Sequence, residues 1–470
     1  MGAQNGKTNN AEVCCETSQG LEVHGTVVRH GRDAVAFEVY DPAVVLQTSE
    51  VLGKFQVLAG RQVVYAGRAV VAGWVYTGTL AVCEARLDEG GAQMVIEPST
   101  LSGSSLQGAY DRFFQEWQSS YRIAPEFKVV VADVEAFLTG VGHWLSQVEL
   151  GLATRHNGVP SERELVETMA PRIIATFNSL EERFEELVCA VPPELLGVHE
   201  HFVRRHWQKL FLCSPFGRRT YYKPLGYAGD YEMMNMVHRN QPEGGSLFAK
   251  FIHFLLVSQW PARSVRNRVV HLKEVILRET IRTACQRRPC RILNVGCGPA
   301  MEIQYFFRDT PPGPPQEFTL LDFNEETLRH ASSRLAEVQR RFGHPARVQT
   351  HHISVYQLLR YGSQPGDGGV ENRYDLIYCA GLFDYLPDQT CRALVELFYN
   401  SLEPGGLVVV ANMKDDKPFR YCMEFVLDWR LIYRNAEKLG SFAPTRALEA
   451  ARMEAEETSV NLFLHVRKPA

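Results

Sequence analysis

The sequence predicts an α/β fold in which a doubly wound, mostly parallel sheet follows a helical segment and a small antiparallel β-barrel. Three observations support this prediction. Between residues 21 and 98, short runs rich in valine, tyrosine and phenylalanine alternate with glycine-marked turns, as in small barrels. From residue 106 to residue 257 the apolar residues recur at helical spacing. After residue 264, apolar runs typical of buried strands alternate with helical stretches.

These changes of pattern divide the chain of 470 residues into four predicted segments. Residues 1–20 are polar, lack the apolar core of a signal peptide and are expected to form a disordered tail. Residues 21–100 are expected to form the barrel, and residues 101–262 a helical substrate or lid region. Residues 263–470 are expected to form the parallel-sheet domain.

The composition is that of an ordinary globular protein, with 45% hydrophobic and 22% charged residues. A formal net charge of −4 gives no electrostatic reason to expect nucleic acid as a partner. Eleven cysteines without a Cys-x-x-Cys pair indicate reduced thiols in the cytoplasm, not a disulfide framework or a zinc site, so we expect no metal. Apolar stretches such as residues 251–257 are too short to span a membrane.

Local signals mark three helices. Ser161 and Glu164 form a capping box, so a helix is expected to begin there, with a kink at Pro171. Another helix, over residues 264–284, leads directly into the predicted sheet. An apolar helix at residues 248–260 is compatible with an acyl substrate and equally compatible with ordinary core packing.

A glycine turn follows the first strand of the predicted sheet. The strand at residues 291–295 leads into Gly296 and Gly298, which let the backbone turn tightly and approach a ligand. The next strand ends near Asp322, where a carboxylate can accept hydrogen bonds from both hydroxyls of a ribose. Met301 stands where a nicotinamide-binding turn has its third glycine, which weighs against a nicotinamide cofactor.

Later runs extend the same pattern. Residues 374–378 form a buried strand that ends at small residues. A Pro-Gly-Gly turn at residues 404–406 enters a further strand. The last strand, at residues 460–468, alternates apolar and polar positions, so it could pair with an earlier strand and close the sheet.

In this order and spacing, these features resemble the class I S-adenosylmethionine (SAM)-dependent methyltransferases over residues 264–470. The resemblance implies a seven-stranded sheet and SAM as the cofactor. It also implies roles for particular residues: Gly296, Cys297 and Gly298 under the methionine part, Glu302 in the same motif, Asp322 on the ribose, Phe323, Ser354 and Val355 at the adenine, and Gly381 and Leu382 beside the methyl donor.

The segment at residues 221–232 contains four tyrosines and two glycines shortly before the predicted sheet. We interpret it as an active-site lid, because loops above the strand ends usually form the site. Tyr222 and Tyr227 are its predicted catalytic residues, and Asp230 is predicted to contact the cofactor. A surface turn between helices, with Asp230 as a helix cap, is the alternative. A second candidate for a part of the active site is a helix at residues 424–434.

The lid segment, the glycine turn and the late Asp-Trp-Arg helix together resemble a bacterial group described as 3-hydroxy fatty acid methyl ester (extracellular factor) biosynthesis methyltransferases. The resemblance implies carboxyl O-methylation of a hydroxy fatty acid or similar small acid. Residues 379–382 replace the Asn/Asp-Pro-Pro-aromatic motif of nucleic-acid amino methyltransferases, which weighs against base methylation. A SAM-binding regulatory or scaffold protein without turnover, and a protein or peptide methyltransferase, are the alternatives.

The N-terminal barrel resembles PilZ domains in its length and in the spacing of its strands. PilZ domains that bind cyclic di-GMP use an arginine-rich entry and an Asp/Asn-x-Ser-x-x-Gly turn. Arg29 and Arg32 are present here, but the turn motif is not. We therefore expect this barrel to be a structural module that docks a protein partner or a second copy of the chain.

Overall fold

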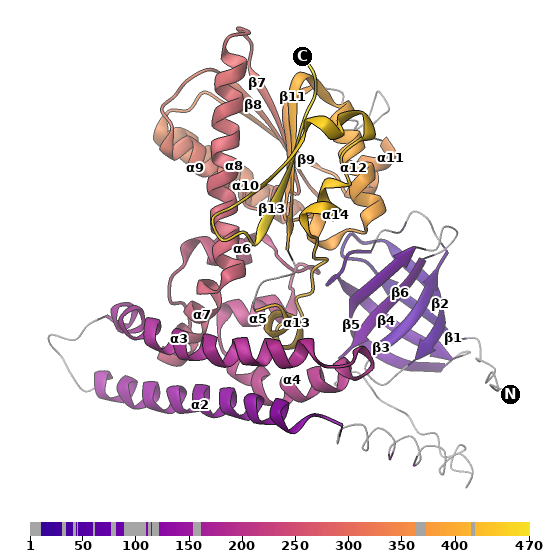
Figure 1. Cartoon of the computed structure of the whole chain (residues 1–470), viewed down its shortest axis with the longest axis vertical. Coiled ribbons are helices and arrows are strands. Elements are labelled where there is room, and N and C mark those ends of the chain that lie inside the picture. The colour runs from indigo at the N-terminus through magenta and orange to yellow at the C-terminus, as the bar shows by residue number, and fades with distance from the viewer. Residues whose placement is uncertain are drawn as a thin grey trace.

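The computed structural model describes residues 11–30, 34–40, 44, 46–59, 62–76, 81–88, 110, 114, 122–153, 161–361, 373–414 and 419–470. It contains a β-barrel, a layer of long helices and a parallel-sheet domain, with the barrel beside the other two parts (Figure 1). Arg32 and the predicted barrel boundary at residue 100 lie outside the described residues.

Six antiparallel strands close into the N-terminal barrel in the order β1-β2-β3-β6-β5-β4. Alternate side chains point inward and form one core, which includes Val13, Phe37 and Phe55. The strands are β1 (Ala11–Glu16), β2 (Glu22–His30), β3 (Ala34–Val39), β4 (Val51–Ala59), β5 (Gln62–Tyr76) and β6 (Ala81–Leu87).

The first strand corrects the predicted disordered tail over residues 11–16; residues 1–10 lie outside the described part of the chain. β1 pairs with both β2 and β4, so it closes the barrel. Its polar positions face outward, while Val13 and Cys15 are buried in the core. A strand with only two inward residues has too short an alternation to stand out from a polar sequence.

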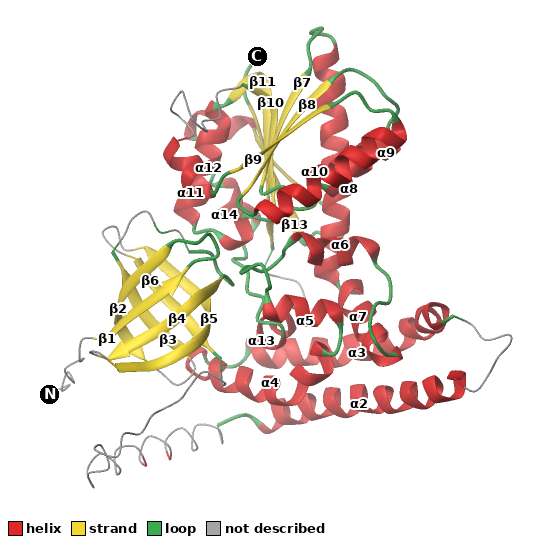
Figure 2. Cartoon of the chain, turned by 180° about the vertical axis from the view of Figure 1, so that it is seen from behind, coloured by secondary structure: helices red, strands yellow, loops and turns green. Residues whose placement is uncertain are grey.

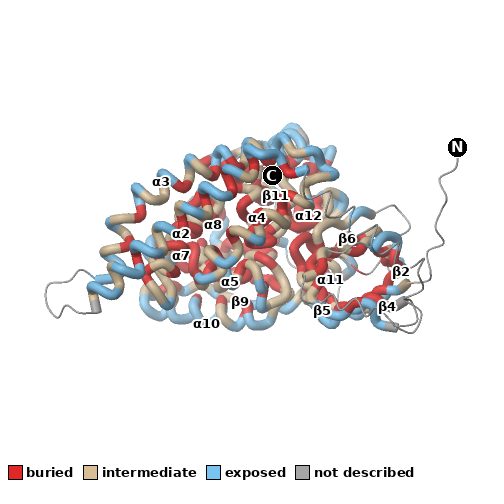
Figure 3. The backbone as a smooth tube through the Cα atoms, turned by 90° about the horizontal axis from the view of Figure 1, so that it is seen from below, coloured by how far each residue is buried: buried red, intermediate tan, exposed pale blue. Residues whose placement is uncertain are grey.

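Long helices form the second part of the molecule. Ser161 and Glu164 make both hydrogen bonds of the predicted capping box, and the helix that they begin continues through Pro171. Seen from below, buried backbone runs through the middle of this layer and exposed turns lie outside (Figure 3). The helices are α2 (Pro125–Ala153), α3 (Glu162–Cys189), α4 (Leu196–Leu212), α5 (Pro215–Tyr222), α6 (Tyr231–Arg239), α7 (Leu247–Ser258) and α8 (Trp260–Ala284), with η3 (Pro193–Leu195) before α4.

Within the described residues, α2 alone has the length and hydropathy of a membrane-crossing helix. This is weak evidence for a membrane span, because long core helices have the same properties. Phe127 of α2 packs against Phe184 of α3, and Trp207 of α4 donates a hydrogen bond to the carbonyl of Val131 (2.9 Å). The predicted cytoplasmic location stays a prediction.

The sheet has seven strands in the order β12-β13-β11-β10-β7-β8-β9, and β13 alone runs antiparallel to its neighbours. This confirms the predicted doubly wound fold. Successive residues of β7 face opposite sides: Ile292 packs in the core with α8 and α9, and Leu293 in the core with α12. The strands are β7 (Cys290–Val295), β8 (Gln316–Asp322), β9 (Arg347–His352), β10 (Tyr374–Ala380), β11 (Leu402–Met413), β12 (Ala451–Ala455) and β13 (Asn461–Arg467).

Helices cover both faces of this sheet (Figure 2). α8 reaches from the helical layer to the sheet, so the two parts share an element (Figure 1). The remaining helices are α9 (Met301–Asp309), α10 (Glu325–Phe342), α11 (Val355–Tyr361), α12 (Asp388–Asn400), α13 (Arg420–Val426) and α14 (Ala436–Gly440), with short 3-10 turns η4 (Phe383–Tyr385) and η5 (Thr445–Ala450).

The helix predicted over residues 424–434 is wrong beyond Val426. α13 ends there, and Asp428 takes a left-handed backbone conformation with φ of 52°. Its buried carboxylate contacts Arg86 of the barrel (3.0 Å), Arg204 of α4 (3.2 Å) and Lys223 after α5 (3.2 Å). This ion cluster links the segment after α13 to the barrel and to the helical layer. The chain at Asp428 is no longer helical.

Candidate active site

The glycine turn between β7 and α9 forms the floor of the site. Gly296 and Gly298 have φ of +68° and +50°, which favours glycine. The backbone N–H groups of Gly296 and Cys297 donate to the carbonyl of Leu321 (2.9 and 3.1 Å), and these bonds fix the turn beside β8. A Cβ atom on Gly296 would lie 3.5 Å from the side chain of Leu382, so this turn forms a narrow part of the site.

Asp322 ends β8 directly beside this turn. Its carboxylate accepts hydrogen bonds from the N–H groups of Gly298 (3.2 Å) and Asn324 (3.0 Å). Burial raises the pKa of this carboxyl to about 6, although the backbone donors oppose the shift. No ion pair of Asp322 with a cation occurs among the described residues. A buried carboxylate of this kind can accept further hydrogen bonds from a ligand diol.

A cavity lies against this carboxylate, and we call it the Asp322 cavity. Most of the predicted cofactor residues line it. The hydroxyl of Ser354 accepts a hydrogen bond from the N–H of Gln357, so it caps α11. The predicted residues that line the Asp322 cavity are Gly296, Gly298, Asp322, Phe323, Ser354, Val355, Gly381, Leu382 and Tyr227.

A second cavity of about 770 Å³, part of it open to solvent, adjoins the first, and we call it the Arg268 cavity. Both cavities are lined by Gly229, Gly296, Gly298, Gly381 and Tyr385, so they meet at the glycine turn. The walls of the Arg268 cavity come from α6, α8, the ends of β7, β10 and β11, and the segment after α13. This arrangement can place two ligands next to each other.

Glu302 and Cys297 line the Arg268 cavity, not the Asp322 cavity. Glu302 accepts hydrogen bonds from Asn294 (2.9 Å) and from the Tyr378 hydroxyl (2.7 Å). Burial raises the pKa of its carboxyl. Because both partners come from neighbouring strands, Glu302 braces β7 against β10 beneath the turn.

The predicted lid lies between the barrel and the sheet domain. The Tyr227 ring contacts Phe323 edge-on (4.8 Å between centroids), and its hydroxyl is hydrogen-bonded to Thr327 (3.2 Å). A Cβ on Gly229 would lie 2.8 Å from the Tyr385 hydroxyl, so glycine allows the lid to approach the site. The N–H of Val51, in the barrel, donates to the carbonyl of Gly226 (2.6 Å). The barrel therefore holds the lid segment.

Two predicted residues lie elsewhere. Tyr222 is 52% exposed and lines a separate hollow between the barrel and α4, because it sits at the end of α5, away from the glycine turn. Asp230 caps α6 by accepting from the N–H groups of Glu232 (3.0 Å) and Met233 (2.9 Å), and it pairs with Arg219. Asp230 lines neither cavity, which corrects its predicted contact with the cofactor.

The sequence analysis missed several lining residues. Arg268 is one of many arginines on helices, and no local motif distinguishes it. Gln47 reaches the Asp322 cavity from the barrel, across more than two hundred residues of sequence. Trp429, by contrast, belongs to the second predicted candidate, residues 424–434; it lines the Arg268 cavity and donates a hydrogen bond to the Tyr385 hydroxyl (2.8 Å).

Part of the sheet domain is similar to a known protein family. Residues 293–408 match the family model described as a methyltransferase domain. None of the curated proteins matches the chain significantly. The match confirms the predicted enzyme class, a SAM-dependent methyltransferase, and it covers the glycine turn, Asp322 and the Pro-Gly-Gly turn.

Solved structures similar to this chain include three of low sequence identity. One is a possible exported protein from Bordetella parapertussis, with 19% identity over 67% of this chain and 100% of that chain and a TM-score of 0.43. Another is the N-methyltransferase NodS from Bradyrhizobium japonicum with S-adenosyl-L-homocysteine. It has 17% identity over 44% of this chain and 88% of that chain and a TM-score of 0.29. A third is magnesium protoporphyrin IX methyltransferase from Synechocystis PCC 6803 with SAM. It has 10% identity over 45% of this chain and 84% of that chain and a TM-score of 0.30.

Proposed function

We propose that this protein transfers the methyl group of SAM to the carboxylate of a small acid with an apolar body, such as a hydroxy fatty acid. The observation that supports this acceptor is a single arginine in a cavity that also has an apolar wall. Within the described residues, Arg268 makes no ion pair, and its guanidinium lies against Gly381, 3.1 Å from where a Cβ would be. The apolar lining residues are Met234, Val265, Val269, Leu272, Met413 and Leu431.

The Asp322 cavity suits the adenosine part of SAM. Asp322 would hold the ribose hydroxyls, and Phe323 with Val355 would contact the adenine. The backbone of Gly296 and Gly298 would approach the methionine part, which leaves the methyl group facing the Arg268 cavity. SAM supplies an electrophilic methyl carbon on a sulfonium, which is an excellent leaving group.

A carboxylate acceptor also agrees with the titratable groups around it. Burial raises the pKa of the Tyr227 and Tyr385 phenols far above neutrality, so both stay protonated and donate hydrogen bonds. Burial lowers the pKa of His238 to about 3, so its imidazole is a weak base. The carboxyl of Asp384 already accepts the N–H of Met413 (2.7 Å). An alcohol or amine acceptor would need a base, whereas a carboxylate does not.

Arg268 and the cavity walls would act mainly by positioning the acceptor. Arg268 would orient the acceptor so that a carboxylate oxygen bonds to the methyl carbon as the carbon–sulfur bond breaks and sulfur keeps the electron pair. The products are a methyl ester and S-adenosylhomocysteine, and no proton is released. The apolar walls and the lid would exclude water from the sulfonium.

Arg268→Gln tests this acceptor site, with Arg278→Gln, an exposed arginine on the same helix, as the matched control. Loss of a charge-assisted pair of about 1.5–3 kcal/mol should raise the KM for a hydroxy fatty acid roughly 10- to 100-fold. The Kd for SAM should stay near that of the wild type. A weaker Kd for SAM with an unchanged acceptor KM would instead assign Arg268 to the cofactor and contradict the proposal.

A further inference from the structure

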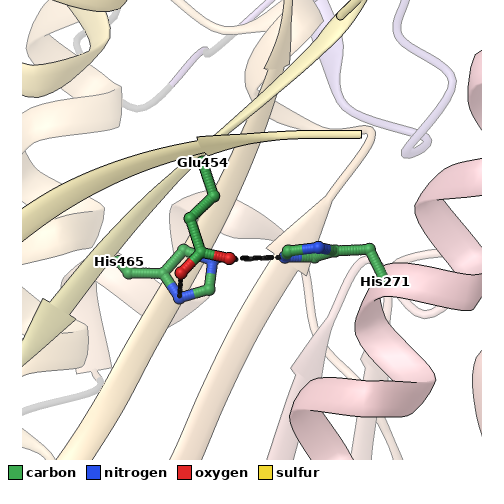
Figure 4. A group of neighbouring side chains, drawn as sticks. All are labelled: His271, Glu454 and His465. Carbon is green, nitrogen blue, oxygen red and sulfur yellow. Dashed lines mark hydrogen bonds and ion pairs between the residues drawn. The ribbon is translucent and has the colours of Figure 1, made fainter. Parts of the chain in front are cut away.

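Two histidines and a glutamate meet at the edge of the sheet, outside both cavities (Figure 4). His271 projects from α8, Glu454 from the edge strand β12, and His465 from β13. The Nε2 atoms of His271 and His465 lie 3.2 Å apart. The Glu454 carboxylate lies 3.8 Å from His271 Nε2 and, through its other oxygen, 3.8 Å from His465 Nδ1.

The distances from the glutamate to the two histidines suit a shared ion better than direct contacts. A separation of 3.8 Å is too long for a hydrogen bond between an imidazole and a carboxylate. Two ligand atoms that bind one tetrahedral Zn²⁺ at about 2.0–2.1 Å lie roughly 3.3 Å from each other. The gaps of 3.2 and 3.8 Å therefore leave room for an ion after small side-chain movements.

The surroundings keep both rings in place. The His271 ring stacks on Phe463, with the centroids 4.0 Å apart. The side chains of His271 and His465 are 13% and 8% exposed, and that of Glu454 is 39% exposed. A neutral imidazole has one unprotonated ring nitrogen, so each ring can offer a lone pair to a metal ion.

We propose that His271, Glu454 and His465 bind a divalent transition-metal ion, for which Zn²⁺ is the best match to two imidazoles and one carboxylate. Both Nε2 atoms become ligands. The hydrogen that one Nε2 donates to the other in the metal-free protein moves to Nδ1 of the same ring by exchange with solvent, so the ring stays neutral. Water fills the open coordination position.

The role of this ion is structural. β12 is at an edge of the sheet and pairs only with β13 among the described strands, so one of its sides has no strand partner there. A bound ion would tie both strands to α8. His271 is also one helical turn from Arg268, so the ion would hold the part of α8 that lines the Arg268 cavity.

The test uses the full-length protein, freed of metal with a chelator and titrated calorimetrically with ZnCl₂. Three variants each remove one ligand: His271→Gln, His465→Gln and Glu454→Gln. Because Glu454 is partly exposed, its variant should fold even if a buried histidine variant does not. His206→Gln is the matched control, since His206 contacts Glu135 (2.6 Å) in a two-residue pair without a third described ligand.

The wild type and His206→Gln should bind a zinc equivalent that all three ligand variants lack. Zinc should raise the melting temperature of the wild type in a concentration-dependent way, because an ion that binds only the native state stabilises it. Co²⁺ should show visible absorption typical of tetrahedral ligation in the wild type and in His206→Gln, but in none of the three ligand variants. Equal zinc stoichiometry and equal melting shifts in the wild type and Glu454→Gln would overturn the proposal.

Discussion

Replacing Asp322 should weaken SAM binding strongly while the protein stays folded. In Asp322→Ala, two hydrogen bonds from ribose hydroxyls to a carboxylate are lost, each worth about 1.5–3 kcal/mol. The lower limit for the pair is about 3 kcal/mol, which corresponds to roughly 100-fold or more in Kd. Asp322→Asn keeps a neutral acceptor, so its loss should be nearer tenfold.

The two variants also separate binding from folding. Asp322→Ala leaves the part-buried N–H groups of Gly298 and Asn324 without their acceptor, which should cost about 1–3 kcal/mol of stability. Asp322→Asn keeps an oxygen for one of these donors. Calorimetry with SAM, on protein whose folding has been checked by circular dichroism, measures the effect. A wild-type Kd in folded Asp322→Ala would refute the placement of the cofactor.

Four further outcomes follow from the structure. Tyr227→Phe should weaken SAM binding or turnover at an unchanged melting temperature, whereas Tyr222→Phe, with its exposed phenol, should match the wild type in both assays. Since Asp322 must be ionised to accept the ribose hydroxyls and its pKa is about 6, SAM affinity should fall below that pH, by up to about tenfold per unit, and a flat profile would contradict this. Asp428→Asn leaves Lys223 buried without its counter-charge, so urea unfolding should show a stability lower by about 3–5 kcal/mol. Wild-type stability of this variant would show that the ion cluster is dispensable. Cyclic di-GMP should leave the melting temperature unchanged, and a saturable upward shift would make the barrel a ligand-binding module.

The sheet domain was predictable because its signals are local. A strand followed by Gly296 and Gly298, and an acid at the end of the next strand, require only neighbouring residues to be recognised. The same is true of the capping box at Ser161. The structure adds that these local features converge, since Asp322 accepts the N–H of Gly298.

The acceptor side could not be predicted in this way. Arg268 reaches its cavity because α8 runs from the helical layer across the sheet, a matter of tertiary packing. Tyr222 and Tyr227 are close in sequence, yet only Tyr227 lies at the site, because α5 ends between them and the chain turns at the lid glycines. The proposed metal ligands have the same character: His271 is far in sequence from Glu454 and His465.

The chemistry of the transferred methyl group tests the central claim most directly. The purified protein is incubated with SAM labelled in its methyl group and with hydroxy fatty acids of different chain length. We predict label in a small product that mild base hydrolyses to labelled methanol, because a methyl ester is base-labile and methylated amines, thiols and alcohols are not. Label that resists base, or that stays on protein, would contradict carboxyl methylation. SAM binding without any transfer would contradict hydroxy fatty acids as the acceptors.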